Sequence, residues 1–266
     1  DPQKDTLPLL GGSQADLKKL VAENAGVAPE DILSWDLYLY SRAQGTVFGA
    51  EKEFIAAPRL DDLECVFAAA KAFLAGENRE NVTVLSLFDN EETGSLTRQG
   101  ADSPFLSEVL ERISLSCGKS REEHLRAIAS GFMLSADNAH AVHPDSPEKS
   151  DPTNRCYLNG GVVVKHSPRY ASDALTAGLF QRICQKAGVP VQVYYNNSKI
   201  PGGGTLGNLS GSHVALPTVD IGLAQLSMHS PYETAGAKDL DYMVWAMQAF
   251  YESVITQTGR EEYAIQ

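Results

Sequence analysis

The stretch "VTVLSLFDNEETGS", residues 82–95, decides how the fold is read. Its first seven residues are apolar and β-branched, which predicts a central strand over 82–88 that is covered on both faces. The strand leads into Asp89 and the adjacent glutamates Glu91 and Glu92. Paired carboxylates at the end of a buried strand need an explanation: either they cap a helix, or a positive charge lies between them.

Helical and strand patterns alternate on both sides of this stretch. Helical spacing predicts helices over 13–26, 59–76, 107–117, 121–130, 171–188 and 238–253. Strand patterns predict strands over 32–41, 82–88, 131–137, 160–166, 191–196 and 218–224. This alternation predicts an α/β fold, a three-layer αβα domain with a mixed, mostly parallel sheet. Two long Gly/Pro-rich loops, 139–155 and 198–211, interrupt it, and loops of that length in a compact domain are usually functional.

Composition narrows the class of protein. A chain of 266 residues can bury a large core, and its net charge of −12 argues against a nucleic-acid partner, which would need clustered Lys and Arg. We expect no membrane span, because no apolar run approaches the ~20 residues that a bilayer requires. The four cysteines are scattered without C-x-x-C spacing, which indicates a reducing compartment such as the cytoplasm.

Acidic and imidazole side chains collect where the predicted elements end. They are Asp61, at the start of a predicted helix, and Glu91, Glu92, Asp137 and His229, each after an apolar run. Ligands of open α/β sheets bind beyond the carboxyl ends of the strands, so we expect these side chains to meet. Carboxylates with an imidazole suit Zn²⁺, Mn²⁺ or Co²⁺. The sequence therefore predicts a metal centre.

Each of these residues also has a simpler interpretation. Asp61 could complement a helix dipole, and Glu91 and Glu92 could cap a helix. Asp137 could form an Asx turn, and His229 could be an ordinary core or surface histidine. The metal interpretation is favoured because all the candidates fall at the ends of elements.

The chain also carries six motifs that resemble, in order, those of the aspartyl aminopeptidase family: "APRLDDL", "LFDNEETGS", "SADNAHAVHP", "KHSPRYAS", "GGGTLG" and "SMHSPYETAG". The similarity extends over about residues 14–256. It implies a zinc-exopeptidase (phosphorylase/hydrolase-like) architecture and two divalent ions, zinc with Mn or Co as alternatives. It also implies a peptide substrate that loses its N-terminal residue, acidic residues included.

The resemblance assigns roles to individual residues. Asp61 is similar to the carboxylate that bridges the two metals, while Glu92, Asp137 and His229 are similar to terminal ligands. Glu91 is similar to the general base that takes a proton from metal-activated water and passes it to the leaving amine. The family also implies a cis peptide bond between Asp61 and Asp62.

Further matches concern the substrate pocket. Lys165 and Tyr170 match substrate-binding positions, so Lys165 could pair with an acidic side chain of the substrate or could be an ordinary lysine at a strand end. The glycine-rich loop 201–207 could let the backbone approach the substrate closely, or it could be only a tight connection.

One departure from the family is serious. Its first metal ligand is a histidine in an H-x-D-S/T-P motif, and nothing here matches it: the one H-x-D, at His143–Asp145, belongs to a later motif. We therefore expect residues 1–13 to be a linker or a remnant of an upstream segment. Residues 14–266 would be the metallopeptidase catalytic domain without its N-terminal segment and most of its dimerisation insert.

This departure predicts an incomplete site. One metal would keep Asp61, Glu92 and His229, while the other would keep only Asp61 and Asp137, too few for tight binding. We expect little or no activity until the missing segment is supplied, and a homo-oligomer when the protein is intact. Two alternatives stay open: a related di-metal amidohydrolase or deacylase, and a non-catalytic subunit of an assembly.

Overall fold

The computed structural model describes residues 1–266 apart from the side chain of Pro2, and it divides the chain into two units, Asp1–Tyr40 and Ser41–Gln266. The first unit holds helices α1 (Pro2–Asp5) and α2 (Leu17–Ala25) and the 3-10 turn η1 (Pro29–Asp31). Helix α2 confirms the helix predicted over 13–26. The side chain of Asp16 accepts a hydrogen bond from the Lys19 amide, and Gly26 ends the helix at a φ of 69°.

The strand predicted over 32–41 does not form. Among the described residues no second strand pairs with it, and a lone strand has no partner for its backbone groups. Its apolar side chains are exposed, Leu33 by 96%. Residues 32–41 have the alternating pattern of a strand, but none of the described strands pairs with them.

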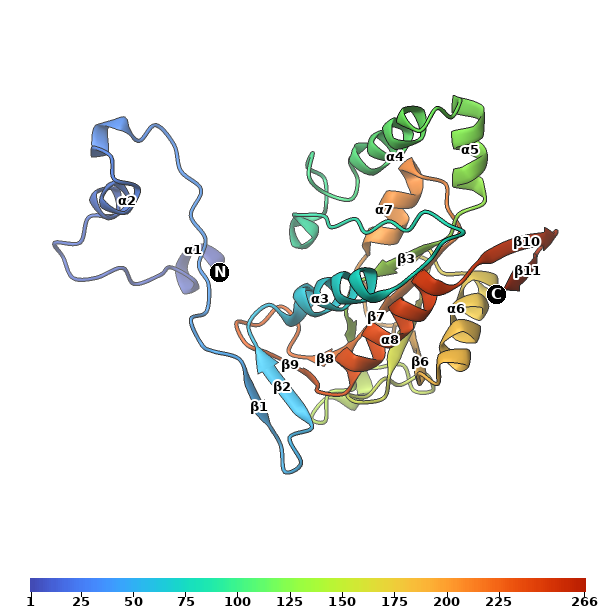
Figure 1. The fold of residues 1–266 in the computed structure, drawn as a ribbon. Helices are drawn as coiled ribbons and strands as arrows, with labels where there is room; N and C mark the ends of the chain where they lie inside the picture. The colour runs from blue at the N-terminus through green and yellow to red at the C-terminus, as the bar shows by residue number, and fades with distance from the viewer. The chain divides into compact units, whose positions relative to one another are not determined.

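A mixed four-stranded sheet forms the centre of the second unit (Figure 1). Its strands are β3 (Met133–Ala136), β5 (Val162–His166), β6 (Val191–Tyr195) and β7 (Thr218–Gly222), in the order β3-β7-β5-β6. Strand β3 runs parallel to β7 and β5 parallel to β6, while β5 and β7 are antiparallel. Two of the three strand pairs are parallel, so the prediction of a mixed, mostly parallel sheet is confirmed. All four strands lie within ranges that the sequence predicted as strands.

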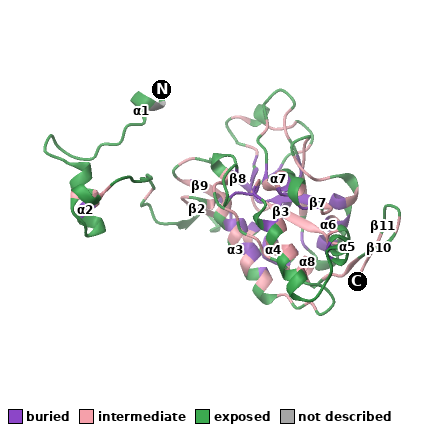
Figure 2. Ribbon diagram, turned by 90° about the horizontal axis from the view of Figure 1, so that it is seen from above, coloured by how far each residue is buried: buried purple, intermediate pink, exposed green. Residues whose placement is uncertain are grey.

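Helices cover both faces of this sheet and give three layers. On one face lie α3 (Leu60–Ala75), α6 (Ala174–Ala187) and α8 (Asp239–Glu252), and on the other lies α7 (Leu206–His213). Alternate side chains of strand β7 point to the two faces of the sheet. Val219 and Ile221 pack in the core beneath α3, α6 and α8. Asp220, between them, points the opposite way and accepts a 2.8 Å hydrogen bond from Thr205, which precedes α7. Figure 2 shows the buried residues concentrated between these layers.

Two further helices and two further sheets complete the unit. Helices α4 (Phe105–Ser116) and α5 (Arg121–Ala129) precede β3, as predicted. A second sheet has the strand order β1-β2-β9-β8-β4; its strands are β1 (Thr46–Phe48), β2 (Phe54–Ala57), β4 (Ala139–His140), β8 (Ala224–Leu226) and β9 (Glu233–Gly236). A terminal hairpin pairs β10 (Ile255–Gly259) with β11 (Glu262–Ile265). The sequence did not predict these strands, since most are too short to show a period of two.

Residues 82–88, predicted as a central strand, form neither helix nor strand and are not part of a sheet. Leu85 packs against the core, whereas Val82 is 85% exposed and Leu87 is 53% exposed. No described strand pairs with this segment, so the prediction of a strand covered on both faces is wrong for this chain. The loop predicted over 198–211 also differs, because helix α7 begins inside it.

Two expectations from composition can be compared with the fold. All four cysteines are free thiols. Of the helices in the described part of the chain, none combines the length and the apolar character needed to cross a membrane.

Candidate metal centre

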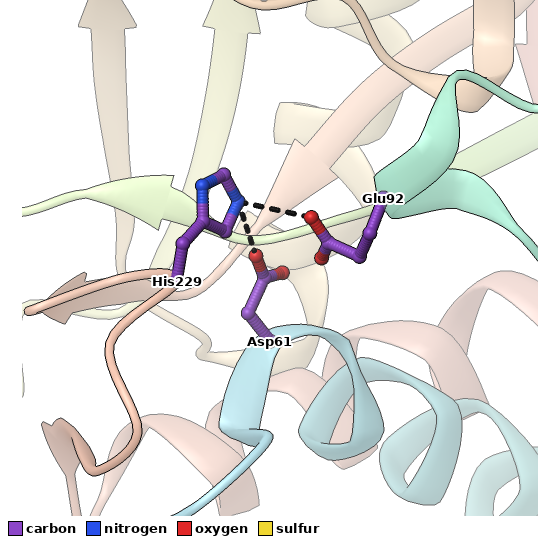
Figure 3. A group of neighbouring side chains, drawn as sticks. All are labelled: Asp61, Glu92 and His229. Carbon is purple, nitrogen blue, oxygen red and sulfur yellow. Dashed lines mark ion pairs between the residues drawn. The ribbon is translucent and has the colours of Figure 1, made fainter. Parts of the chain in front are cut away.

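Three of the predicted metal ligands meet at one point (Figure 3). His229 Nε2 lies 3.2 Å from Asp61 Oδ2 and 3.1 Å from Glu92 Oε2. The three side chains come from positions far apart along the chain and offer one imidazole nitrogen and two carboxylate oxygens, all within 4.8 Å of one another. This donor set is typical of a Zn²⁺ site.

Irregular backbone positions each of the three ligands. Asp61 stands at the start of α3 with non-helical angles, directly after β2 has turned through Arg59 at a φ of 60°. Glu92 lies in the 3-10 turn η2 (Glu91–Thr93), which follows the segment 82–88. His229 follows β8 at a φ of 66°. The cis peptide bond expected between Asp61 and Asp62 is present.

The three ligands differ in their access to solvent. The side chain of Asp61 is 3% exposed, whereas those of Glu92 and His229 are 52% and 63% exposed. The centre is therefore buried on the side of Asp61 and open to solvent on the side of Glu92 and His229.

A second group of carboxylates adjoins the first. Asp61, Asp62 and Asp137 each place an oxygen within 4.8 Å of the others. Asp137, which follows β3, was a predicted ligand, but Asp62 was not. The Asp61–Asp62 doublet was the available signal, although a sequence pattern does not show that both side chains turn inward.

The electrostatics of this cluster fit a bound cation. Burial, and then the charges of Asp137 and Glu92, raise the pKa of Asp61 to about 8. Burial and the charge of Asp137 also raise the pKa of Asp62 well above its ordinary value. Asp61 Oδ1 and Asp62 Oδ1 are buried without a hydrogen-bond partner. Carboxylates crowded in this way need a positive charge between them, and a divalent ion supplies it.

Glu91, the predicted general base, stands beside the ligands in η2. Burial, followed by the charges of Asp137 and Glu92, raises its pKa to about 7, while the positive charges of Lys165 and His229 act in the opposite direction. A carboxylate that titrates near neutrality suits both accepting and donating a proton.

Lys165 is placed differently from a free substrate-binding cation. Its side chain is buried, and Nζ donates to Asp137 O at 2.8 Å, to Asn138 O at 3.0 Å and to Asp137 Oδ2 at 3.2 Å. These three acceptors match the three protons of an ammonium group. The ring of Tyr170 lies 5.2 Å from Nζ. Both residues thus adjoin Asp137, but the contacts of Lys165 are made within the protein.

Two polar residues near the centre, Asn138 and Glu233, lie inside the motifs "SADNAHAVHP" and "SMHSPYETAG" but were not predicted as site residues. Asn138 is buried and donates to Leu60 O at 3.2 Å and to Gln225 Oε1 at 3.1 Å, which links the start of α3 to β8. Glu233, at the start of β9, is also buried and contacts the backbone of two ligand residues. Their places in these motifs were the available signal, and the folded arrangement shows what each side chain contacts.

Comparisons with known proteins agree with this chemistry. The family described as "Aminopeptidase I zinc metalloprotease (M18)" matches residues 4–251. A probable M18 family aminopeptidase 2 of Clostridium acetobutylicum is 43% identical over 259 residues, which cover 94% of this chain and 60% of that protein. Its counterpart from Mycobacterium leprae is 41% identical over 257 residues, with coverage of 95% and 60%.

Solved structures extend the comparison to the fold. The crystal structure of yeast aminopeptidase 1 superposes with a TM-score of 0.77 at 33% identity and covers 89% of this chain and 54% of its own. An M18 family aminopeptidase from Thermotoga maritima gives a TM-score of 0.81 at 25% identity, with coverage of 93% and 58%. The chain thus spans about 60% of the length of the curated relatives it matches.

Proposed function

Because the chain belongs to the M18 family of zinc metalloproteases, we propose that it forms the catalytic core of a metal-dependent aminopeptidase. Its substrates would be peptides, from which it removes N-terminal residues, acidic ones included. The observation that supports this most directly is the convergence of Asp61, Glu92 and His229 within hydrogen-bonding distance of one point. Zinc bound there would lower the pKa of a water molecule and so supply the nucleophile.

The side chains around that point divide the remaining work. Asp61, Glu92 and His229 would hold one ion, and Asp61 with Asp137 would face a second, with Mn or Co as alternative metals. Glu91 would accept the proton of the attacking water and return it to the leaving amine, in keeping with a pKa near neutrality. Lys165 and Tyr170, predicted to line the substrate pocket, would form the wall beside Asp137.

The second ion would lack ligands in this chain. The group Asp61, Asp62 and Asp137 contains no imidazole: among the described residues, no histidine joins these three carboxylates within the same 4.8 Å. The relatives have additional length that this chain does not span. We therefore propose that a separate segment of the intact protein supplies a further ligand, and that residues 1–266 alone are weakly active or inactive.

Two exposed apolar features support such a segment. Along the segment 82–88, Val82, Val84 and Leu87 are exposed. On α3, Leu63, Phe67 and Leu74 expose a stripe with helical spacing. Exposed apolar surfaces of this kind mark places where another polypeptide packs. The intact protein would also form a homo-oligomer, since one of the similar solved structures is the dodecamer of S. cerevisiae mApe1.

Activity with and without added polypeptide tests this proposal. The assay would measure zinc content and the hydrolysis of an aspartyl dipeptide with a free α-amine, for the chain alone and for the chain mixed with the N-terminal segment of a relative. We expect turnover only in the mixture, and only for the free amine. Hydrolysis of the N-acylated dipeptide instead would indicate the deacylase alternative. No turnover by a zinc-loaded mixture would contradict an enzymatic function and favour a non-catalytic subunit.

A further inference from the structure

Glu233 is a buried carboxylate that reaches two of the candidate ligand residues at once. Its Oε2 accepts a hydrogen bond from the backbone amide of Asp61 at 2.9 Å, and its Oε1 accepts one from the backbone amide of His229 at 2.7 Å. The residue is 2% exposed. One side chain therefore joins two positions that are 168 residues apart in the sequence.

Both amides need an acceptor from outside their own element. The first amides of a helix have no intrahelical partner, and Asp61 stands at the start of α3. His229 holds a φ of 66°, a conformation that residues other than glycine adopt only when their surroundings fix it. Glu233 accepts a hydrogen bond from both amides, so one carboxylate contributes to the orientation of Asp61 and of His229.

The strand that carries Glu233 sets its position. Strand β9 pairs with β2, where Glu233 lies opposite Ala57, and with β8, which leads toward His229. The two ligand residues follow the ends of the two neighbours of β9. A side chain at the start of the middle strand is thus within reach of both.

The choice of glutamate is informative because its charge is unfavourable locally. Burial is the main cause of the raised pKa of Asp61 and of Glu64, and the charge of Glu233 raises both further, so acidic groups repel one another here. Glutamine would remove that repulsion, but its amide group has only one acceptor oxygen. A carboxylate is the side chain of this length that accepts two hydrogen bonds from two separate donors.

We propose that Glu233 is a positioning residue that holds Asp61 and His229 in the geometry that binds a divalent cation. This inference rests on the proposed function for the identity of the cation, but not for the two hydrogen bonds. Groups that orient metal ligands typically change metal affinity by about 10–100-fold when they are removed.

Two substitutions separate geometry from charge. Glu233→Gln keeps the shape of the side chain and loses one acceptor, while Glu233→Asp keeps the charge but is one methylene shorter. We expect the affinity of the zinc-free 266-residue chain for Zn²⁺, measured by competition with a chromophoric chelator, to fall about 10–100-fold for both variants. The control is Glu122→Gln, an exposed glutamate on α5, which should bind zinc as the unchanged chain does.

A second measurement needs no metal. Hydrogen exchange followed by NMR in the zinc-free chain should show protected amides at Asp61 and His229, and at least one of them should exchange faster in each variant. Unchanged exchange, or unchanged zinc affinity in both variants, would overturn the inference. If the unchanged chain binds no zinc but protects both amides, the proposed metal function fails while the positioning by Glu233 is supported.

Discussion

At the scale of single residues, the proposed roles of the neighbouring glutamates, Glu92 as a metal ligand and Glu91 as the general base, can be tested separately. Glu92 contacts His229, whereas Glu91, one position earlier, has a pKa raised to about 7 by burial and nearby carboxylates. Glu91→Gln removes the proton acceptor and leaves Asp61, Glu92 and His229 in place. When the variant chain is mixed with the N-terminal segment of a relative, we expect its zinc content to be unchanged and its turnover to fall at least about 100-fold.

Steady-state kinetics and metal analysis of the same sample check this prediction. Glu77→Gln, an exposed glutamate after α3, is the matched control and should keep full turnover. Near-normal turnover of Glu91→Gln would show that another group moves the proton.

The raised pKa of Asp61 predicts how stability depends on pH. Its folded pKa, about 8, lies above its ordinary value of 3.8, so the folded chain keeps a proton that the unfolded chain has lost. The contribution of Asp61 to the free energy of unfolding is therefore full below about pH 4 and is lost as the pH rises through about 8. Zinc binds the deprotonated form, so the stabilisation that it gives should grow over the same interval.

Urea denaturation at several pH values, with and without zinc, measures this effect. The difference between the unchanged chain and Asp61→Asn isolates the residue, because asparagine does not titrate. The explanation would be wrong if the zinc-free chain gained stability relative to Asp61→Asn as the pH rose.

The sequence predicted which residue types gather at the centre, but not how all of them are used. Asp61, Glu92 and His229 were identified because carboxylates and a histidine at the ends of elements are chemically distinctive, and the structure brings them together. Glu233 and Asn138 act through hydrogen bonds to backbone atoms of distant segments. Such contacts depend on tertiary proximity, for which a local pattern carries no signal.

At the scale of elements, helix α6 offers an internal comparison between two glycines. Gly188 ends the helix at a φ of 70°, whereas Gly178 lies inside it with no atom near the position that a Cβ would occupy. Gly188→Ala should lower the free energy of unfolding by about 1 kcal/mol, because alanine disfavours the left-handed conformation. Gly178→Ala should raise it by about 0.5–1 kcal/mol, because alanine is the better helix former.

Chemical denaturation of the two variants side by side gives the result. Effects of the same sign would mean that the two positions do not differ in backbone conformation as described.

Helices were predicted more accurately than strands for a physical reason. The amphipathic pattern and the capping residues of α2 and α6 lie within the helix and its immediate neighbours. A strand such as the one expected over 82–88 exists only if another strand pairs with it, and no described strand does. The apolar pattern of residues 82–88 therefore carried no information about whether a partner strand exists.

At the scale of the whole molecule, the exposed side chains of the segment 82–88 predict how the chain meets further polypeptide. Val82 is 85% exposed, so Val82→Lys should change the free energy of unfolding by no more than about 0.5 kcal/mol. The same substitution should weaken restoration of activity by the added N-terminal segment, because a charge would then be buried in the new contact.

Titration of activity against added segment measures the second effect. Leu125→Lys on α5, where the leucine is 52% exposed, serves as the control for a new surface charge. Equal restoration by Val82→Lys and the unchanged chain would place the contact elsewhere.

The unequal solvent access of the three ligands also determines how quickly an ion would be replaced. The side chain of Asp61 is buried, whereas those of Glu92 and His229 are more than half exposed, so an ion held by the three would be open to bulk water on the side of Glu92 and His229. Residence time would then be governed by fluctuations of these two outer side chains, while Asp61 would govern the strength of retention. A small chelator should be able to draw the ion out through this opening without the protein unfolding.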